Sequence, residues 1–172
     1  MIRPFRDLRP TLGEGCFVAE TAAIIGDVVV GARASIWYGA VLRGDVFSIR
    51  VGDETSIQDN TVIHVTGGKH ATRVGSRVTV GHAVILHGCT VGDLCVIGMG
   101  STVLDRAEIG DGSILGAGAL VTPGTRIPSG VLAVGAPARV KRPLTDEERA
   151  SLSESADHYV ALARAYLADP GR

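Results

Sequence analysis

Three histidines near the middle of the chain, His64, His82 and His87, are the side chains best suited to carry chemistry. Neutral imidazole is a common ligand for zinc and similar metals. Three imidazoles with one open coordination position are typical of a hydrolytic or hydrating zinc site. A fourth histidine, His70, lies between them in the sequence. The first question is therefore whether the fold brings the first three rings together.

A six-residue repeat surrounds these histidines and must position them. From Val91 to Ile127 an aliphatic residue occupies every sixth position, often followed by glycine. Six residues suit one short strand plus a corner, so three strands make a coil of about 18 residues, and successive coils stack about 4.8 Å apart. The alternative is a flat β-sandwich with many turns, but a sandwich does not require seven aliphatic residues at a constant spacing of six. The repeat resembles that of the hexapeptide left-handed β-helix, and the left hand comes from that resemblance, since the general rule for parallel crossovers favours the right hand.

The expected fold is therefore mainly β, a single-stranded left-handed parallel β-helix of hexapeptide repeats followed by a C-terminal α-helix. The predicted division is a lead-in over residues 1–19, the β-helix over residues 20–135, and a connector and helix over residues 136–172 that packs on the coil. Residues 64–74 interrupt the phase and predict a short excursion from the coil.

The C-terminal segment carries a strong helix signal after an extended connector at residues 136–143. Thr145 and Glu148 form a capping box at the start of the helix. One apolar stripe follows, which must lie on an outer face of the coil or on a neighbouring protomer; it consists of Leu152, Ala156, Tyr159, Ala163 and Tyr166. The helix is predicted to run to about Leu167, with Pro170 and Gly171 ending it.

Composition narrows the function classes. The net charge of −1 gives no reason to expect a nucleic-acid partner or an anionic membrane surface. No apolar run is long enough to span a bilayer, and Met1 to Asp7 do not resemble a signal peptide. An odd number of cysteines without a signal predicts free thiols in a reducing cytoplasm, and packing is the expected role of these residues; they are Cys16, Cys89 and Cys95.

The spacing of the histidines bears on assembly. His82 and His87 are five residues apart, nearly one side of the triangular coil, so they should point outward at different places. Their rings need not converge within one chain. A trimer with its three-fold axis parallel to the coils would place one protomer's edge against another's face, so we expect a shared metal site only in an oligomer.

Several motifs resemble, in order, those of the gamma-class carbonic anhydrases and their hexapeptide relatives. The resemblance covers most of the chain, and its three-histidine arrangement is more specific than the repeat, which many acyltransferases share. The motifs are Arg43-Gly-Asp45, Ile57-Gln58-Asp59, Val62-Ile63-His64-Val65, Val80-Gly81-His82, Leu86-His87-Gly88-Cys89, Gly98-Met99-Gly100 and Gly135-Ala-Pro-Ala-Arg139.

The resemblance implies a homotrimer with three metals at its subunit interfaces, each held by His64 and His87 of one protomer and His82 of the next. Zinc suits three neutral imidazoles, and iron or cobalt also bind such sites. The implied reaction is the reversible hydration of CO2 to bicarbonate by a metal-activated hydroxide.

The resemblance also assigns roles outside the ligand set. Gln58 corresponds to a residue that hydrogen-bonds metal-bound water or bicarbonate. Tyr159 corresponds to a tyrosine that approaches the site, although packing is its simpler role. Arg43, Asp45 and Asp59 correspond to residues that form ion pairs at the subunit interfaces.

The chain departs from the best-studied branch of that family in its proton-carrying groups. Val46 stands where that branch has glutamate, and Ser56 replaces an asparagine that would orient it. The loop from Val65 to Arg73 carries no carboxylate. These departures predict slow proton export, with His70 as the substitute shuttle or simply a solvated loop residue.

Three other functions remain open on the sequence. The same hydroxide would attack a thioester, which gives a CoA-thioester hydrolase. A hexapeptide acyltransferase needs one histidine as a base, fewer than this chain presents. A metal-binding scaffold without turnover is compatible with the missing carboxylates.

Overall fold

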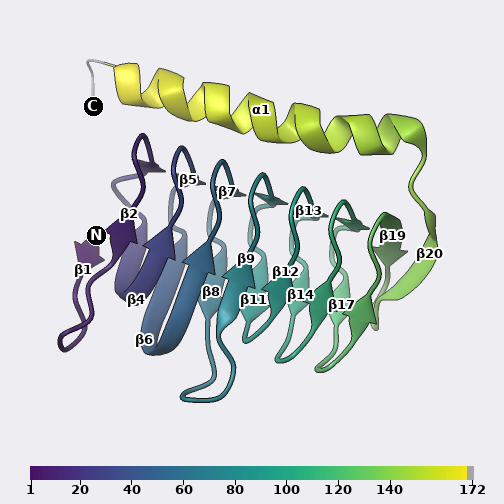
Figure 1. Ribbon diagram of the computed structural model, residues 1–172, viewed down its shortest axis with the longest axis horizontal. Helices are drawn as coiled ribbons and strands as arrows, with labels where there is room; N and C mark the ends of the chain where they lie inside the picture. Colours follow the sequence, from purple (N-terminus) through teal and green to yellow (C-terminus); the bar gives the residue numbers. More distant parts are fainter. Residues whose placement is uncertain (170–172) are drawn as a thin grey trace.

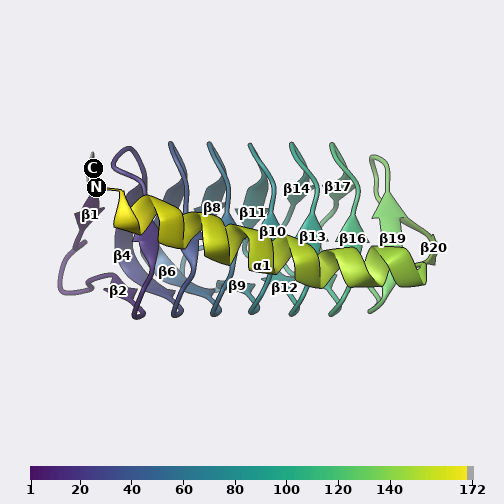
Figure 2. The same ribbon diagram turned by 90° about the horizontal axis from the view of Figure 1, so that it is seen from above.

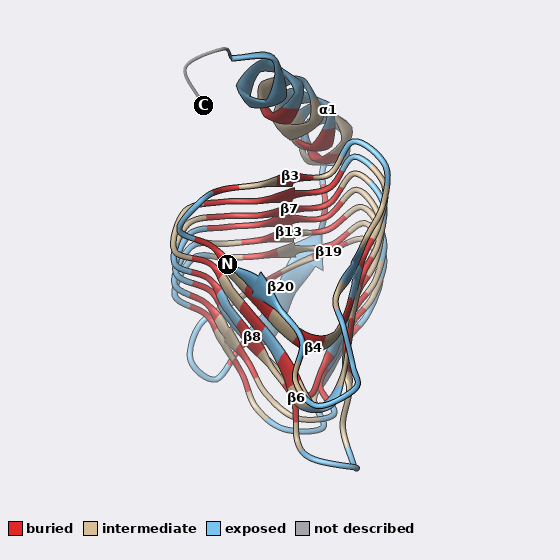
Figure 3. Ribbon diagram, turned by 90° about the vertical axis from the view of Figure 1, so that its left-hand side faces the viewer, coloured by how far each residue is buried: buried red, intermediate tan, exposed pale blue. Residues whose placement is uncertain are grey.

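The computed structural model describes residues 1–169, and the predicted helix end at Pro170 and Gly171 lies outside them. The chain winds into a triangular parallel β-helix, left-handed as the family resemblance implied, with one long helix lying along it (Figures 1 and 3). Three flat faces form its sides. Short strands of successive coils pair in parallel on each face, so the backbone groups of a strand between two coils find their partners one coil before and one coil after.

Face 1 is an eight-stranded sheet. Its parallel strands are β3 (Phe17–Val18), β5 (Ser35–Ile36), β7 (Ser56–Ile57), β10 (Thr79–Val80), β13 (Val96–Ile97), β16 (Ile114–Leu115) and β19 (Val131–Val134). The connector that was predicted as merely extended forms β20 (Arg139–Pro143), which pairs antiparallel with β19. This difference has a simple cause: the last coil leaves an unpaired edge, and the returning chain supplies its hydrogen-bond partners.

Faces 2 and 3 belong to one twelve-stranded sheet, because the long strands β4 (Ala23–Val30) and β6 (Val41–Val51) bend around the corner between them. Face 2 also holds β1 (Ile2–Arg3), β8 (Val62–His64), β11 (Ile85–His87), β14 (Thr102–Val103) and β17 (Leu120–Val121). Face 3 also holds β2 (Thr11–Leu12), β9 (Thr72–Val74), β12 (Thr90–Val91), β15 (Glu108–Ile109) and β18 (Arg126–Ile127). The lead-in segment thus contributes three short strands, β1, β2 and β3, to the sheets.

The interior is a column of aliphatic side chains, one layer per coil. The residues at six-residue spacing all point inward and are no more than 4% exposed; they are Val91, Ile97, Val103, Ile109, Leu115, Val121 and Ile127. Cys89 and Cys95 are buried in the same core as free thiols, and burial raises the pKa of Cys89 to about 12 and of Cys95 to about 11. The packing role expected of these two cysteines follows from this environment.

The helix α1 (Asp146–Ala168) lies lengthwise over face 1 (Figure 2). Leu152, Ala156 and Ala163 of the predicted stripe are buried against the coil of the same chain. Near the C-terminal end of α1, the Tyr166 ring packs against the rings of Phe17 and Trp37 at centroid distances of 5.2 Å. Apolar burial on an outer face therefore docks the helix on its own coil.

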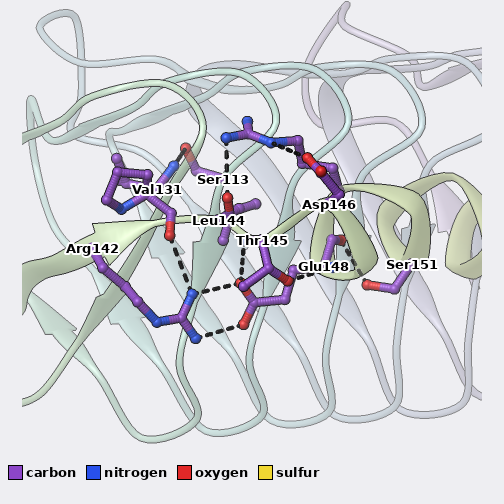
Figure 4. A network of polar contacts seen from close by, with 10 residues as sticks. Ser113, Val131, Arg142, Leu144, Thr145, Asp146, Glu148 and Ser151 are labelled. Carbon is purple, nitrogen blue, oxygen red and sulfur yellow. Dashed lines mark hydrogen bonds and ion pairs between the residues drawn. The ribbon is translucent and has the colours of Figure 1, made fainter.

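The start of α1 is fixed by the predicted capping box (Figure 4). The Thr145 side chain accepts from the Glu148 backbone N–H at 3.2 Å, and the Glu148 carboxylate accepts from the Thr145 backbone N–H at 2.9 Å. Arg142 of β20 donates to both carboxylate oxygens of Glu148, at 2.7 and 2.8 Å. Because the bidentate pair joins strand to helix, the turn between them has a defined direction. Among residues 1–169, α1 is the one helix, and it has no apolar stretch long enough to cross a membrane.

A ladder of charged residues follows one corner of the coil. Arg33, Glu54 and Arg77 have φ near +56° and stack on successive coils. Glu54 accepts from Arg33 at 2.7 Å and from Arg77 at 2.8 Å, and Arg77 also pairs with Asp157 of the helix at 2.9 Å. The ladder connects three coils and the helix.

We expect this ladder to make stability sensitive to acid. The hydrogen bonds from Arg33 and Arg77 lower the pKa of Glu54 below its ordinary value of 4.5. A lowered folded-state pKa means that the stabilisation is complete above about pH 4.5 and is lost as the pH falls through the folded value. Glu54→Gln should therefore flatten the acid limb of a plot of melting temperature against pH. The exposed helix residue Glu154, changed to Gln, is the control, and an equal flattening in both variants would contradict the assignment.

Candidate metal centre

Two of the three histidines meet at the corner between faces 2 and 3. His64 ends β8 and His87 ends β11, and the parallel register of these strands places the two residues directly opposite each other. Their ring centroids are 5.2 Å apart, and Nδ1 of His64 lies 3.2 Å from Nε2 of His87. Two ring nitrogens therefore face one point at the surface of the coil.

This spacing fits two ligands of one metal ion. Zinc-to-nitrogen bonds of about 2.0–2.1 Å in a tetrahedral site place neighbouring nitrogens about 3.3 Å apart. The separation of 3.2 Å between His64 and His87 agrees with that value. The side chains are 20% and 33% exposed in the single chain, so the point between the two nitrogens is accessible from outside the coil.

Each of these rings also has a carboxylate partner on its other nitrogen. Nε2 of His64 is 3.1 Å from Asp45, and Nδ1 of His87 is 2.7 Å from Asp105. Asp45 also accepts from Arg43 at 2.5 Å. Burial opposes ionisation of Asp45, but the hydrogen bonds from Arg43 and His64 outweigh it, so the pKa of Asp45 is lowered. A carboxylate on the second ring nitrogen is the usual outer partner of a metal-binding histidine.

The third histidine, His82, lies at a different corner. It follows β10, where face 1 turns into face 2, and its Nδ1 is 2.9 Å from Asp59. Face 2 therefore has His82 along one edge and the pair of His64 and His87 along the other. Within residues 1–169 of the single chain, no cluster of three or more His, Cys, Asp or Glu side chains is arranged to hold a metal ion.

The two remaining predicted site residues, Gln58 and Tyr159, lie near the corner that carries His82. Gln58 follows β7 and is 4% exposed. Its backbone N–H donates to the Val80 carbonyl at 3.0 Å, and its carbonyl accepts from the Thr61 N–H at 3.2 Å. Tyr159 of α1 contacts the Trp37 ring edge-on at a centroid distance of 6.1 Å. Burial, with a smaller contribution from the nearby charge of Asp59, raises the pKa of Tyr159.

The excursion between β8 and β9 projects from the coil close to His64 and His87 (Figure 1). Thr66 and His70 close it with two backbone hydrogen bonds of 3.0 Å. Below the loop, the buried Thr72 hydroxyl donates to the His64 carbonyl at 2.5 Å and accepts from the Gly88 N–H at 2.8 Å. Thr72 thereby replaces ladder bonds that the excursion interrupts, and the two histidine-bearing strands stay in register.

Asp105 is the site residue that sequence reasoning missed. It lies 18 residues after His87, one regular coil, so its position beneath that histidine follows from the repeat once the register is known. The spacing of 18 residues between His87 and Asp105 was visible in the sequence, but aspartates are common at the corners of this repeat. Asp53, Asp93 and Asp111 occupy another corner and accept backbone N–H groups there. The pairing of β11 with β14 shows which aspartate faces an imidazole.

Comparisons with known proteins agree with the fold. The bacterial transferase hexapeptide family (six repeats) matches residues 71–105. A hexapeptide transferase family protein from Anaplasma phagocytophilum superposes with a TM-score of 0.93 at 48% sequence identity, covering 96% of this chain and 98% of that one. Fold and repeat thus define a hexapeptide-repeat β-helix protein.

Sequence relatives that are named carbonic anhydrases define a narrower class among the hexapeptide-repeat proteins. Gamma carbonic anhydrase 1, mitochondrial, of Arabidopsis thaliana is 49% identical over 168 residues. The match covers 95% of this chain but 61% of the plant protein's length. A carbonic anhydrase of Geobacillus kaustophilus is 42% identical over 168 residues, which cover 98% of this chain and 92% of the relative. The chain belongs to the gamma-class carbonic anhydrase family.

Proposed function

We propose that this protein is a metal-dependent carbonic anhydrase that hydrates CO2 reversibly at the interfaces of a homotrimer. The observation that carries the proposal is the arrangement of the three histidines on face 2. The pair of His64 and His87 forms two thirds of a ligand set at one edge, and His82 with its own carboxylate lies at the other edge. In a cyclic trimer, one edge of each protomer meets the opposite edge of its neighbour, so each interface would hold one complete set.

The surface between the two edges supports burial against a second copy. Val41, Val62 and Ile85 point outward from face 2 in three successive coils, and Thr102 and Leu120 follow them in the next two. Val62 is 39% exposed and Ile85 is 43% exposed in the single chain. An apolar strip flanked by polar histidine corners is the composition expected of a protein interface with a dry centre. Arg43, Asp45 and Asp59, proposed as interface residues, lie at the ends of this strip.

A bound zinc ion would act there as a Lewis acid and lower the pKa of water to about 7, the effect for which carbonic anhydrases are the standard example. The three histidines would hold the ion, and Asp45 and Asp59 would orient the rings of His64 and His82. The side-chain amide of Gln58 has both donors and an acceptor and lies near the corner of His82, so it is suited to bind CO2 or bicarbonate. Tyr159 approaches the corner of His82 and Gln58 from α1.

Zinc is the proposed metal, with iron and cobalt as the alternatives that elemental analysis would distinguish, and the cytoplasm is the proposed location. The acyltransferase alternative gains no support from the site, because an acyltransferase needs one basic histidine and leaves the adjacent pair of His64 and His87 unexplained. A thioester hydrolase would use the same histidines as a carbonic anhydrase. A scaffold would bind the metal without turnover.

One experiment separates these functions. We expect protein purified without chelators or affinity metal to elute as a trimer by light scattering, to contain about one metal ion per chain, and to accelerate CO2 hydration in a stopped-flow assay. A metal-free trimer would favour the acyltransferase. A metal-loaded trimer that hydrates no CO2 in any buffer, but cleaves acyl-CoA, would replace the proposal with the hydrolase. A monomer that retains its metal would contradict the shared site.

A further inference from the structure

We propose that Asp105 is the positioning residue of His87: it fixes the ring orientation and the tautomer that leave Nε2 free to bind metal. The proposal rests on the proposed function insofar as His87 is a metal ligand. Its structural part, the tautomer of His87, stands independently of any metal. Nothing in the sequence motifs assigns a role to Asp105.

The hydrogen bond between the two side chains determines which ring nitrogen holds the proton. Asp105 Oδ1 lies 2.7 Å from Nδ1 of His87. An ionised carboxylate only accepts hydrogen bonds, so Nδ1 must be the protonated nitrogen and Nε2 carries the lone pair. Nε2 is the atom that lies 3.2 Å from His64 Nδ1. The carboxylate thus selects the tautomer whose free nitrogen points to the shared centre.

The second oxygen of the carboxylate is also held. Asp105 Oδ2 accepts from the Thr66 hydroxyl at 2.7 Å. Thr66 belongs to the excursion closed by its backbone bonds with His70. With both oxygens engaged, the carboxylate has little freedom to rotate, and the ring of His87 is anchored to the loop as well as to its strand.

The backbone at Gly88 makes room for this arrangement. Gly88 has φ of +56°, and a Cβ there would lie 2.2 Å from Asp105 Oδ1 and 2.9 Å from the Cβ of His70. Any other residue would push the carboxylate off the imidazole. A glycine is expected at this corner of the repeat, but Gly88 has a second role: its missing side chain leaves room for the Asp105 carboxylate.

Asp105 differs from the carboxylates of the other two histidines. Asp45 is shared between His64 and the charged Arg43, which competes for it. The pair of Asp59 and His82 is more open, with side chains 35% and 48% exposed. The Asp105 carboxylate, in contrast, contacts one imidazole and accepts from one neutral hydroxyl. We therefore expect its loss to affect a single ligand without breaking an ion pair to arginine.

The test compares Asp105→Asn and Asp105→Ala with Asp111→Asn, a matched control whose carboxylate accepts the Asp93 backbone N–H at another corner. Zinc affinity is measured by competition with a chromophoric chelator, and oligomeric state is checked by light scattering. We expect zinc affinity to fall about 10- to 100-fold in both Asp105 variants and to stay at the wild-type value in the control. Wild-type affinity in folded Asp105→Ala would overturn the proposal.

The second readout needs no metal. In metal-free protein, long-range 15N NMR correlations should show His87 of the wild type as the Nδ1–H tautomer, with a shift toward Nε2–H in Asp105→Ala. Thr66→Val keeps the carboxylate but removes the hydrogen bond to its second oxygen, so it should weaken zinc less than Asp105→Ala does. A wild-type His87 in the Nε2–H tautomer would overturn the proposal even if zinc binds. Absence of zinc binding by the wild type, with the Nδ1–H tautomer present, would refute the proposed function and leave the positioning contact standing.

Discussion

Replacing His82 by alanine should remove bound metal from every site, although His82 contacts neither His64 nor His87 within its own chain. The reason is that, in the proposed trimer, His82 of each protomer completes the ligand set of its neighbour. A tetrahedral centre that loses one of three protein ligands holds zinc far more weakly. His70→Ala is the control, since His70 lies in the excursion and belongs to no proposed ligand set. Elemental analysis after gel filtration measures the difference, and equal metal in the two variants would refute the choice of ligands.

Mixed trimers test the sharing directly. His64→Ala and His82→Ala homotrimers each lack a ligand at every site. Random co-assembly of equal amounts should restore about a quarter of the wild-type metal, because each mixed cyclic trimer contains one interface at which both contributing edges are intact. Sites built within one chain would give no restoration, since no chain in the mixture has all three histidines.

The second large effect concerns proton export, and it should appear as a strong dependence of CO2 hydration on buffer. Each turnover releases a proton that must reach the solvent. Val46, 49% exposed, stands beside the excursion in place of a carboxylate, and Gly68 donates its N–H to the Val46 carbonyl at 3.3 Å. The loop itself carries no carboxylate, so His70 is its one side chain of a type suited to carry protons near neutral pH. We expect slow hydration in weak buffer and faster hydration when imidazole carries the proton.

Variants locate the limiting step. His70→Ala should lower kcat in weak buffer by about tenfold or more, leave metal content unchanged, and be rescued by imidazole. Gln58→Ala should lose hydration at every buffer concentration, because it removes a substrate contact rather than a proton carrier. A glutamate at position 46 should speed hydration only if Ser56 or another group orients it. Hydration that is independent of buffer in both the wild type and His70→Ala would contradict a role for His70 in proton export.

The sequence by itself determined the core and the helix, and it indicated which side chains form the proposed site. Inward residues such as Ile97 and Leu115 were predictable because the strand period and the coil length impose one phase on every coil. The start of α1 was predictable because a capping box is a local arrangement of Thr145 and Glu148. The choice of histidine as a metal ligand follows from side-chain chemistry alone.

Tertiary structure decided which residues meet. His64 and His87 are 23 residues apart, more than one regular coil, because the excursion adds residues between them, and only strand register shows that they converge. The helix stripe fitted either its own coil or a neighbour, and the aromatic rings of Phe17 and Trp37 on face 1 determine the docking. Asp105 was invisible because many corner aspartates in the repeat accept only backbone N–H groups. A contact between coils depends on register accumulated along the whole chain, and no local pattern of residues contains it.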